Sequence, residues 1–182
     1  GSWSSCSRPV VRSSGRPVVI HHEALFHMAD ASTPDPRRAA RELAVQSLFC
    51  WDLCRHAEGG LPLPDDLADG TPDGAAALAA ELVEGVRTQR TPLDAAIDQR
   101  LENWTIGRLA ATDRAILRLG AYEILYRAEV PPRVAINEAV ELAKRYGSDG
   151  KTARLVNGVL DRLARDHRPG EVRKAKPAEP AG

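Results

Sequence analysis

The sequence has 182 residues, which suits one domain or two small helical bundles that share a core. Its 25 basic and 25 acidic side chains give a formal net charge of zero, so a nucleic-acid surface would have to be a local patch. The longest apolar run is far shorter than the roughly 18 residues that span a bilayer, which excludes a transmembrane helix. Strand-forming residues are sparse and alanine, leucine and arginine abundant, so the expected fold class is all-α. Three cysteines do not make a disulfide framework, and a reducing cytoplasm is the expected compartment.

The N-terminal stretch, residues 1–35, has no hydrophobic periodicity and is rich in serine, proline and arginine, so we expect it to be disordered. Gly1-Ser2 resembles a cloning remnant, and Met28 would suit a native start. A transit peptide is the less favoured alternative. The three histidines of this stretch have no cysteine or carboxylate partner at ligand spacing, and no metal site is expected there.

A first helix is predicted from Pro36 to about His56, with Asp35 as its N-cap and proline at the first helical position. Apolar and small residues at helical spacing form its expected buried stripe: Ala40, Leu43, Ala44, Ser47, Leu48, Trp51 and Cys54. Cys50 and Cys54 lie one turn apart, and we interpret them as small core residues rather than as half of a metal site.

Arginines crowd the first turns of this helix, where the helix dipole is already positive and further cations do not stabilise it. They are Arg37, Arg38 and Arg41, and their placement suggests an anionic ligand. Phe49 follows Arg38 by about three turns and should project from the same side. An aromatic ring beside arginines suits an unpaired nucleic-acid strand, with a base on the ring and phosphates on the arginines. The alternative is a solvated basic turn with Phe49 in the core, and the residues alone do not separate the two.

Three helices are predicted in the middle of the chain, after a connector at 57–74 that is full of glycine, proline and aspartate. They cover about 75–90, 91–104 and 112–127. Thr91 should cap the second, with Pro92 at its first position, and the third should lie at the centre of the C-terminal bundle because it is the most apolar segment. The second helix also carries three carboxylates that we interpret as a solvated face: Asp94, Asp98 and Glu102.

The clearest pattern of the sequence predicts a helical hairpin between residues 130 and 163. Pro131 and Pro132 precede its first helix, and Gly147 should end that helix as a left-handed cap. The second helix contains Asn157-Gly158 inside an apolar run, although glycine costs roughly 0.5–1 kcal/mol there relative to alanine. Close packing against another helix is the simplest explanation.

Both helices of this hairpin resemble the NusB family of bacterial transcription antitermination factors, through Val134-Ala-Ile-Asn-Glu-Ala-Val-Glu-Leu-Ala-Lys144 and Val156-Asn-Gly-Val-Leu-Asp161. The segment from Arg37 to Phe49 is similar to the arginine-rich motif of that family. The resemblance covers residues 36–165. It implies an all-α fold of about seven helices in two small bundles that share a core.

The resemblance also implies functional residues. An RNA surface would comprise the first-helix residues together with the loop and first turn before residue 155, namely Arg37, Arg38, Arg41, Phe49, Asp149, Lys151 and Arg154. Asp113 and Glu123 would contact a small-subunit ribosomal protein that is the partner of the family. Ala39 stands where the family often has a further basic residue, and the loop before Lys151 is one residue longer than usual. Gly150-Lys-Thr is not a P-loop, because Arg145 replaces the first glycine and a helix precedes it.

In function, the resemblance implies a non-enzymatic factor without a cofactor or metal. It would bind boxA single-stranded RNA with a small-subunit ribosomal protein, NusE, and act on RNA polymerase in ribosomal RNA transcription. The alternatives are a NusB-like domain of an rRNA cytosine methyltransferase and a helical adaptor that binds only proteins. Self-association into a homodimer, as in some family members, stays open. Residues 166–182 are expected to form a disordered tail.

Overall fold

The computed structural model describes residues 12–13, 16–17, 35–53, 72–102 and 104–172. The chain divides into two units, residues 1–33 and 34–182. In the first unit, two strands of two residues each, β1 (Arg12–Ser13) and β2 (Arg16–Pro17), pair in antiparallel fashion. Apart from these strands, the predicted disorder of residues 1–34 and the choice of start residue lie outside the described residues.

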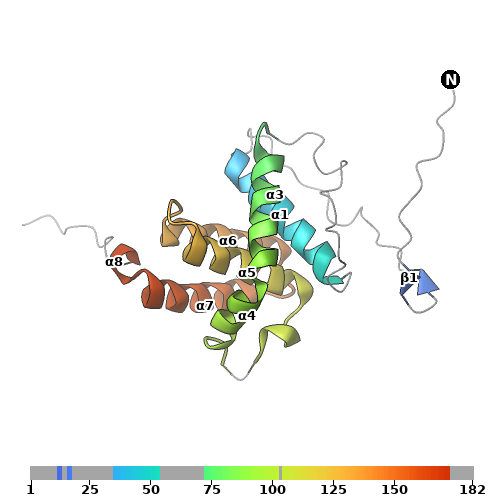
Figure 1. Ribbon diagram of the computed structural model, residues 1–182. Helices are drawn as coiled ribbons and strands as arrows, with labels where there is room; N and C mark the ends of the chain where they lie inside the picture. The colour runs from blue at the N-terminus through green and yellow to red at the C-terminus, as the bar shows by residue number, and fades with distance from the viewer. Residues whose placement is uncertain (1–11, 14–15, 18–34, 54–71, 103, 173–182) are drawn as a thin grey trace, which may run out of the picture. The chain divides into compact units, whose positions relative to one another are not determined.

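The second unit is helical, which confirms the all-α class (Figure 1). Within the described residues its elements are α1 (Pro36–Leu53), α3 (Ala75–Thr88), α4 (Arg90–Asp98), the 3₁₀ helix η2 (Ile106–Arg108), α5 (Ala111–Tyr126), α6 (Pro132–Tyr146), α7 (Thr152–His167) and α8 (Pro169–Val172). None of the helices in this part of the chain is long and apolar enough to cross a membrane.

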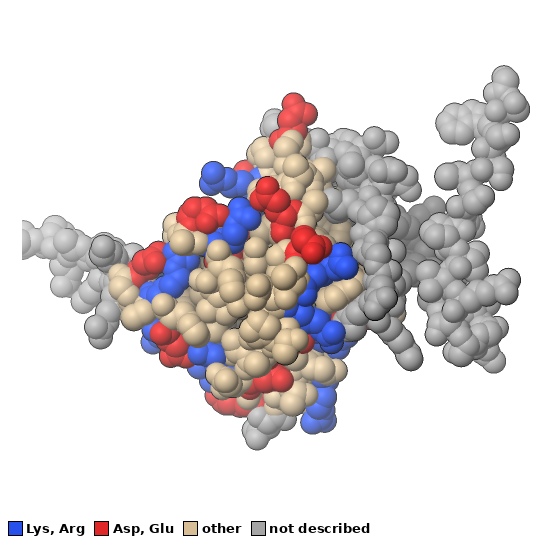
Figure 2. Space-filling view, viewed as in Figure 1, with Lys and Arg blue, Asp and Glu red and all other residues tan. Residues whose placement is uncertain are grey.

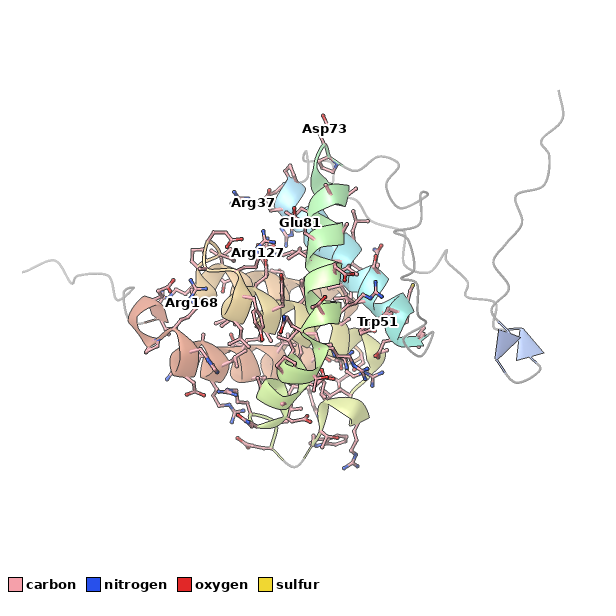
Figure 3. The ribbon with its side chains drawn as sticks, viewed as in Figure 1. Arg37, Trp51, Asp73, Glu81, Arg127 and Arg168 are labelled. Atoms are coloured by element: carbon pink, nitrogen blue, oxygen red, sulfur yellow. The ribbon has the colours of Figure 1, made fainter. Side chains whose placement is uncertain are left out.

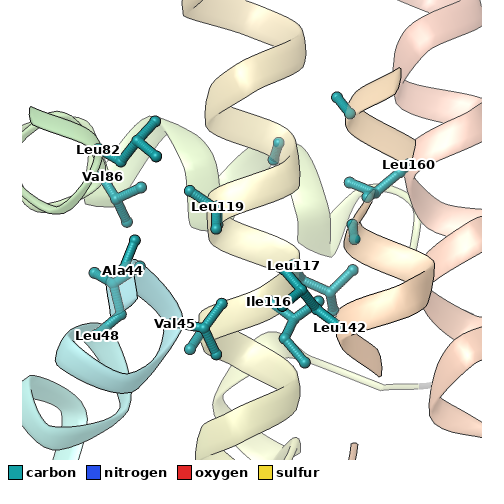
Figure 4. Packing of buried hydrophobic residues seen from close by; sticks show 14 of the residues in the cluster. Ala44, Val45, Leu48, Leu82, Val86, Ile116, Leu117, Leu119, Leu142 and Leu160 are labelled. Carbon is teal, nitrogen blue, oxygen red and sulfur yellow. The ribbon is translucent and has the colours of Figure 1, made fainter. Parts of the chain in front are cut away.

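Helix α5 lies at the centre of the unit, where ten of its sixteen residues are buried. Figure 4 shows α1 and α3 on one side of α5 and the last two long helices on the other. Leu48 and Val86 approach from the first side, and Leu142 and Leu160 from the second. One continuous hydrophobic core results. The expected arrangement, two small bundles that share a core, is therefore confirmed.

The start of α1 agrees with the prediction, whereas the start of α4 does not. Asp35 accepts a hydrogen bond from the backbone N–H of Arg37 at 3.0 Å, as an N-cap should. Helix α4, however, begins at Arg90 rather than after Thr91. The reason is that α3 and α4 share Gln89 as their boundary residue, whose N–H bonds back to Gly85 and whose carbonyl accepts from Leu93. Thr91 therefore lies inside the helix and cannot cap it.

The prediction that Gly147 is a left-handed cap was also wrong. Its φ is −61°, which any residue can adopt. A Cβ atom at this position would lie 2.3 Å from the carbonyl oxygen of Ala143 and 2.8 Å from the side chain of Thr152. The glycine is thus required by close packing between the end of α6 and the start of α7.

Gly158 shows the opposite outcome, because the close packing expected there is absent. A Cβ atom at Gly158 would meet only the end of the Arg162 side chain, at 3.9 Å. Close packing occurs instead at Gly120 of α5, where a Cβ atom would lie 2.5 Å from a methyl group of Leu160. The structure gives no packing reason for the glycine at position 158.

The folded part extends beyond residue 165, at which we predicted it to end. Helix α7 continues to His167, and the short helix α8 follows. Between them Arg168 donates to the carbonyl oxygens of Val130 at 2.8 Å and Ala128 at 3.0 Å, and pairs with Glu171 (Figure 3). Arg168 therefore attaches the end of α7 to the connection between α5 and α6. The predicted disorder of residues 173–182 lies outside the described residues, as does the predicted end of the first helix near His56.

Candidate nucleic-acid interface

Two exposed arginines stand at the N-terminal end of α1. Arg37 and Arg38 are both exposed, and no acidic residue lies in this first turn. Figure 3 shows Arg37 at one end of α1 and Trp51 at the other. Within the described part of the chain neither guanidinium group makes a hydrogen bond or ion pair with another residue. Two cations without an ion-pair partner among the described residues therefore lie at the positive end of the helix dipole, where an anion would be stabilised.

Arg38 also lies close enough to α6 to influence it. Lys144 makes the main contribution to lowering the pKa of Glu141, and the positive charge of Arg38 adds to the effect. The N-terminal end of α1 is therefore next to α6, and the two helices contribute to one surface.

Arg41, the third arginine of the predicted cluster, is buried and only 6% exposed. Its Nε donates to both carboxylate oxygens of Glu123, at 3.0 and 3.1 Å, and its Nη2 lies 2.8 Å from Glu123 Oε1. Oε2 of Glu138 in α6 lies 4.0 Å from Nη1 of Arg41. The structure thus pairs a predicted RNA residue with a predicted partner residue in the interior. This geometry suits a role in holding α1 against α5 and α6 better than direct contact with a ligand.

Phe49 is partly exposed, on the same helix as Arg37 and Arg38. About two turns before it, Glu42 forms an ion pair with Arg145 at the end of α6, with 2.5 Å between Oε1 of Glu42 and Nη1 of Arg145. Burial raises the pKa of the neighbouring Tyr146 hydroxyl, and the negative charge of Glu42 raises it further. These contacts join the middle of α1 to the end of α6, immediately before the α6–α7 loop, residues 147–151.

The α6–α7 loop is held by Asp113, the first acidic residue of α5. Asp113 is 4% exposed, and its Oδ1 accepts a hydrogen bond from Ser148 N at 3.0 Å. Its Oδ2 accepts from the hydroxyl groups of Ser148 at 2.6 Å and Thr152 at 3.2 Å. The carboxylate that we predicted to meet a protein partner is therefore occupied in fixing the loop to the core.

Asp149 fixes the other side of the same loop. Its Oδ1 accepts from the backbone N–H groups of Lys151 at 2.8 Å and Thr152 at 2.9 Å, so it covers the N-terminal end of α7. The hydrogen bond from Lys151 N is the main reason that the pKa of Asp149 is lowered. Lys151 and Arg154 remain exposed, and no residue in the described part of the chain forms an ion pair with either.

The predicted site residues therefore fall into two sets. Those that are exposed or partly exposed and can meet a ligand are Arg37, Arg38, Phe49, Lys151 and Arg154. Those that hold other groups in place are Arg41, Asp113, Glu123 and Asp149. Figure 2 shows basic and acidic side chains interspersed on the face in view, as expected for a chain without net charge.

An ionic network at the far end of α1 was missed by sequence reasoning. Asp52, whose side chain is 5% exposed, pairs with Arg114 and Arg118 of α5, and Arg118 also binds Asp94 of α4 at 2.7 and 2.9 Å. Burial by itself would raise the pKa of Asp52, but the hydrogen bonds and charges of the two arginines lower it. The interpretation of Asp94 as part of a solvated face was wrong, since helical periodicity does not reveal a partner 24 residues away.

Asp98 and Glu102 also have partners, although Glu102 remains exposed, as predicted. Asp98 Oδ1 accepts from the backbone N–H of Ile106 at 2.6 Å, and Glu102 pairs with Arg162 of α7 at 2.6 Å. No group of three or more potential metal ligands occurs among the described residues. The predicted site residues that can meet a ligand are thus four exposed cations and one partly exposed aromatic ring, which can hold phosphates and stack on a base.

Comparison with known proteins identifies the family of the chain. The sequence model of the NusB family matches residues 38–165. The transcription antitermination protein NusB of Desulfitobacterium hafniense is 40% identical over 129 residues, or 70% of this chain and 86% of the relative. That of Bacillus velezensis is 44% identical over 132 residues, or 71% and 96%.

Solved structures of similar fold come from the same family. NusB of T. maritima has a TM-score of 0.65 and 34% identity, covering 76% of this chain and 96% of that one. A chain in the crystal structure of antitermination factors NusB and NusE in complex with dsRNA has a TM-score of 0.61 and 29% identity, covering 72% and 97%. The family match, the identity over most of the folded unit and the shared fold lead to one conclusion: the chain belongs to the NusB family of transcription antitermination proteins.

Proposed function

We propose that this protein binds single-stranded RNA of the boxA type together with the small-subunit ribosomal protein NusE, and that the complex acts on RNA polymerase in the cytoplasm to suppress premature termination. The observation that carries the proposal is the pair of exposed arginines, Arg37 and Arg38, at the positive end of α1. Within the described residues neither guanidinium group forms an ion pair or hydrogen bond, so an RNA phosphate would be favoured there.

A second group of cations supports the same ligand. Lys151 and Arg154 project from the start of α7, and the loop before them is fixed by Asp113 and Asp149. The structure of NusB and NusE with dsRNA provides a precedent within the family for an RNA-bound assembly. Because few of the exposed cations lie at the candidate RNA surface and the chain has no net charge, its affinity for RNA alone should be weak, and a partner that enlarges the surface should increase it.

The roles of the individual residues follow from their exposure. Arg37, Arg38, Lys151 and Arg154 would hold phosphates, and Phe49 would stack against a base. The four buried or locally bonded residues act by positioning: Arg41, Asp113, Glu123 and Asp149. The protein would thus be a binding factor rather than an enzyme.

The proposal is tested by titrating labelled boxA single-stranded RNA with the protein, with and without NusE, over a range of salt concentrations. The variant Arg37→Gln/Arg38→Gln should bind RNA at least tenfold more weakly. Its plot of log affinity against log salt should be shallower by about 1.4, because two phosphate contacts on a single strand are lost.

A matched control removes the same charge elsewhere. Arg162→Gln/Arg165→Gln changes two exposed arginines on α7 that pair with acids on the surface. This variant should bind RNA nearly as the unmodified protein does. Equal affinity of the two double variants and the unmodified protein would show that the end of α1 does not bind RNA.

A further inference from the structure

The turn between α4 and α5 presents an exposed tryptophan stacked with an arginine. Trp104 is 53% exposed, more than any other large hydrophobic side chain among the described residues. The guanidinium carbon of Arg108 lies 4.7 Å from the centroid of the indole ring, within the range of a cation–π interaction. Arg108 is itself exposed, and within the described residues its guanidinium group forms no ion pair or hydrogen bond with another residue.

The backbone of this turn, residues 104–109, is fixed by contacts with Asp98 and Arg114. The side chain of Ile106 is buried, and its backbone N–H donates to Asp98 at 2.6 Å. Nη1 of Arg114 donates to the carbonyl oxygens of Gly107, at 3.3 Å, and of Leu109. Because the backbone is fixed in this way, Trp104 and Arg108 are presented to solvent with little conformational freedom to lose on binding.

The first turn of α5 connects the 104–109 turn to the C-terminal part of α1, which carries Phe49, and to the α6–α7 loop. Arg114 also donates to Asp52 of α1 at 2.7 Å. Asp52 is three residues after Phe49 in that helix. Its neighbour Asp113 holds Ser148 of the α6–α7 loop. Two adjacent residues thus place the Trp104–Arg108 pair at the end of α5 at which α1 and the α6–α7 loop also meet.

We propose that Trp104 and Arg108 form an additional contact for single-stranded RNA, which continues the path of the strand beyond α1 and the α6–α7 loop. One base would stack on the tryptophan–arginine pair, and the N–H groups of Arg108 would hold a phosphate. A polar setting that contains the cation Arg108 favours RNA over an apolar protein segment, because the neighbouring residues Thr105 and Gly107 are exposed and offer no hydrophobic rim. The inference rests on the proposed function and extends it.

The test compares two labelled single-stranded RNAs, the boxA element alone and the same element extended on both sides, each in the presence of NusE. Trp104→Ala should weaken binding of the extended RNA about 5- to 100-fold, the range for loss of one stacked base. Binding of the short RNA should change less than about twofold, because its contacts on α1 and the α6–α7 loop are retained. Trp104→Phe should restore most of the lost affinity, since a smaller aromatic ring still stacks.

Arg108→Gln separates the charge from the ring. It should make the salt dependence for the extended RNA shallower by about 0.7, the value for one phosphate on a single strand. The matched control is Arg162→Gln, which removes an exposed arginine that pairs with Glu102 and should leave both RNAs bound as before.

A third measurement does not depend on any variant. Extended RNA that carries iodouracil outside the boxA element should crosslink to Trp104 on irradiation, and mass spectrometry of the digested complex should identify that residue. If the unmodified protein binds both RNAs, yet Trp104→Ala binds the extended RNA equally well and no crosslink maps to Trp104, the inference is wrong and the proposed function stands. If the unmodified protein with NusE binds neither RNA, the proposed function is wrong and the inference that rests on it is wrong as well.

Discussion

The guanidinium group of Arg41 and the carboxylate of Glu123 form a buried ion pair that joins α1 to α5, with 2.8 Å between Nη2 and Oε1. Both residues came from the sequence as candidates for contact with external ligands, one with RNA and the other with a protein. The pair instead fixes the helix that carries Arg37 and Arg38 against the centre of the fold. Its effect on RNA binding should therefore be indirect.

Breaking this pair should be strongly destabilising. Arg41→Met leaves the charge of Glu123 buried without its main partner, and Glu123→Leu leaves that of Arg41, so each should lower the free energy of unfolding by about 3–5 kcal/mol. The double variant Arg41→Met/Glu123→Leu should recover most of this loss, because two apolar side chains replace both charges. Urea unfolding of the three variants measures the effect.

The double variant also distinguishes positioning from contact. If Arg41 only positions α1, Arg41→Met/Glu123→Leu should bind RNA within about threefold of the unmodified protein. A drop as large as that of Arg37→Gln/Arg38→Gln, in a variant that is fully folded by circular dichroism, would instead mean that Arg41 touches the RNA.

Two helical glycines should respond in opposite ways to alanine. A Cβ atom at Gly85 would lie 2.1 Å from the hydroxyl oxygen and 2.2 Å from Cζ of Tyr122, so Gly85→Ala must displace the ring or separate α3 from α5. We expect a loss of about 1–3 kcal/mol in the free energy of unfolding. Gly158→Ala meets only the flexible end of Arg162 and should gain roughly 0.5–1 kcal/mol through helix propensity.

Thermal unfolding of the two alanine variants in parallel provides the measurement. A stabilised Gly85→Ala protein would contradict the packing of Tyr122 on α3. If Gly158→Ala is more stable but binds RNA or NusE less well, the glycine at that position serves a ligand rather than the fold.

The ionic network around Asp52 should make stability depend on acidic pH. The folded-state pKa of Asp52 is below its ordinary value of 3.8, because Arg114 and Arg118 outweigh the effect of burial. A lowered carboxyl pKa contributes stability that is fully present above the unfolded-state pKa and is lost as the pH falls through the folded-state value. The contribution of Asp52 should therefore be complete at neutral pH and decline below about pH 4.

Asp52→Asn isolates this contribution. At neutral pH it should cost about 3 kcal/mol, since it leaves Arg114 and Arg118 without their shared partner. Between neutral pH and about pH 3 the difference in unfolding free energy between this variant and the unmodified protein should shrink. A difference that stays constant over that range would show that the charge of Asp52 does not stabilise the fold.

Removing the carboxylate of Asp113 should loosen the α6–α7 loop. In Asp113→Ala the amide of Ser148 loses its acceptor, so its hydrogen exchange should accelerate, while that of Leu119 in the centre of α5 should stay protected. RNA affinity should fall as well, by about three- to tenfold, because Lys151 and Arg154 would no longer be held in one arrangement. Exchange measured by NMR, together with the RNA titration, checks both effects.

A control for Asp113→Ala is Asp166→Ala, which removes an exposed carboxylate at the end of α7 that pairs with Arg100. That variant should change neither the exchange of Ser148 nor the RNA affinity. Unchanged exchange of Ser148 in Asp113→Ala would show that the loop does not depend on this carboxylate.

Much of this protein was determined by local sequence pattern. The 3.6-residue spacing of apolar side chains located α1, α3, α5, α6 and α7 to within a few residues, because each of these helices buries one face in a single core. Asp35 and Pro36 marked the start of α1 for the same local reason, and the motifs of the C-terminal hairpin were sufficient to identify the family.

Only the tertiary structure decided which charged residues face outward. Arg41 looks like Arg38 in the sequence, but the first meets Glu123, 82 residues away, and the second faces solvent. Asp94 was expected to be solvated, but Arg118 pairs with it. Close packing requires glycine at position 147 and not at position 158, because the distances between helices set the space at each. Helical periodicity specifies which face of a helix is buried, whereas the partner of a buried charge depends on how distant helices pack, and that information is in the fold.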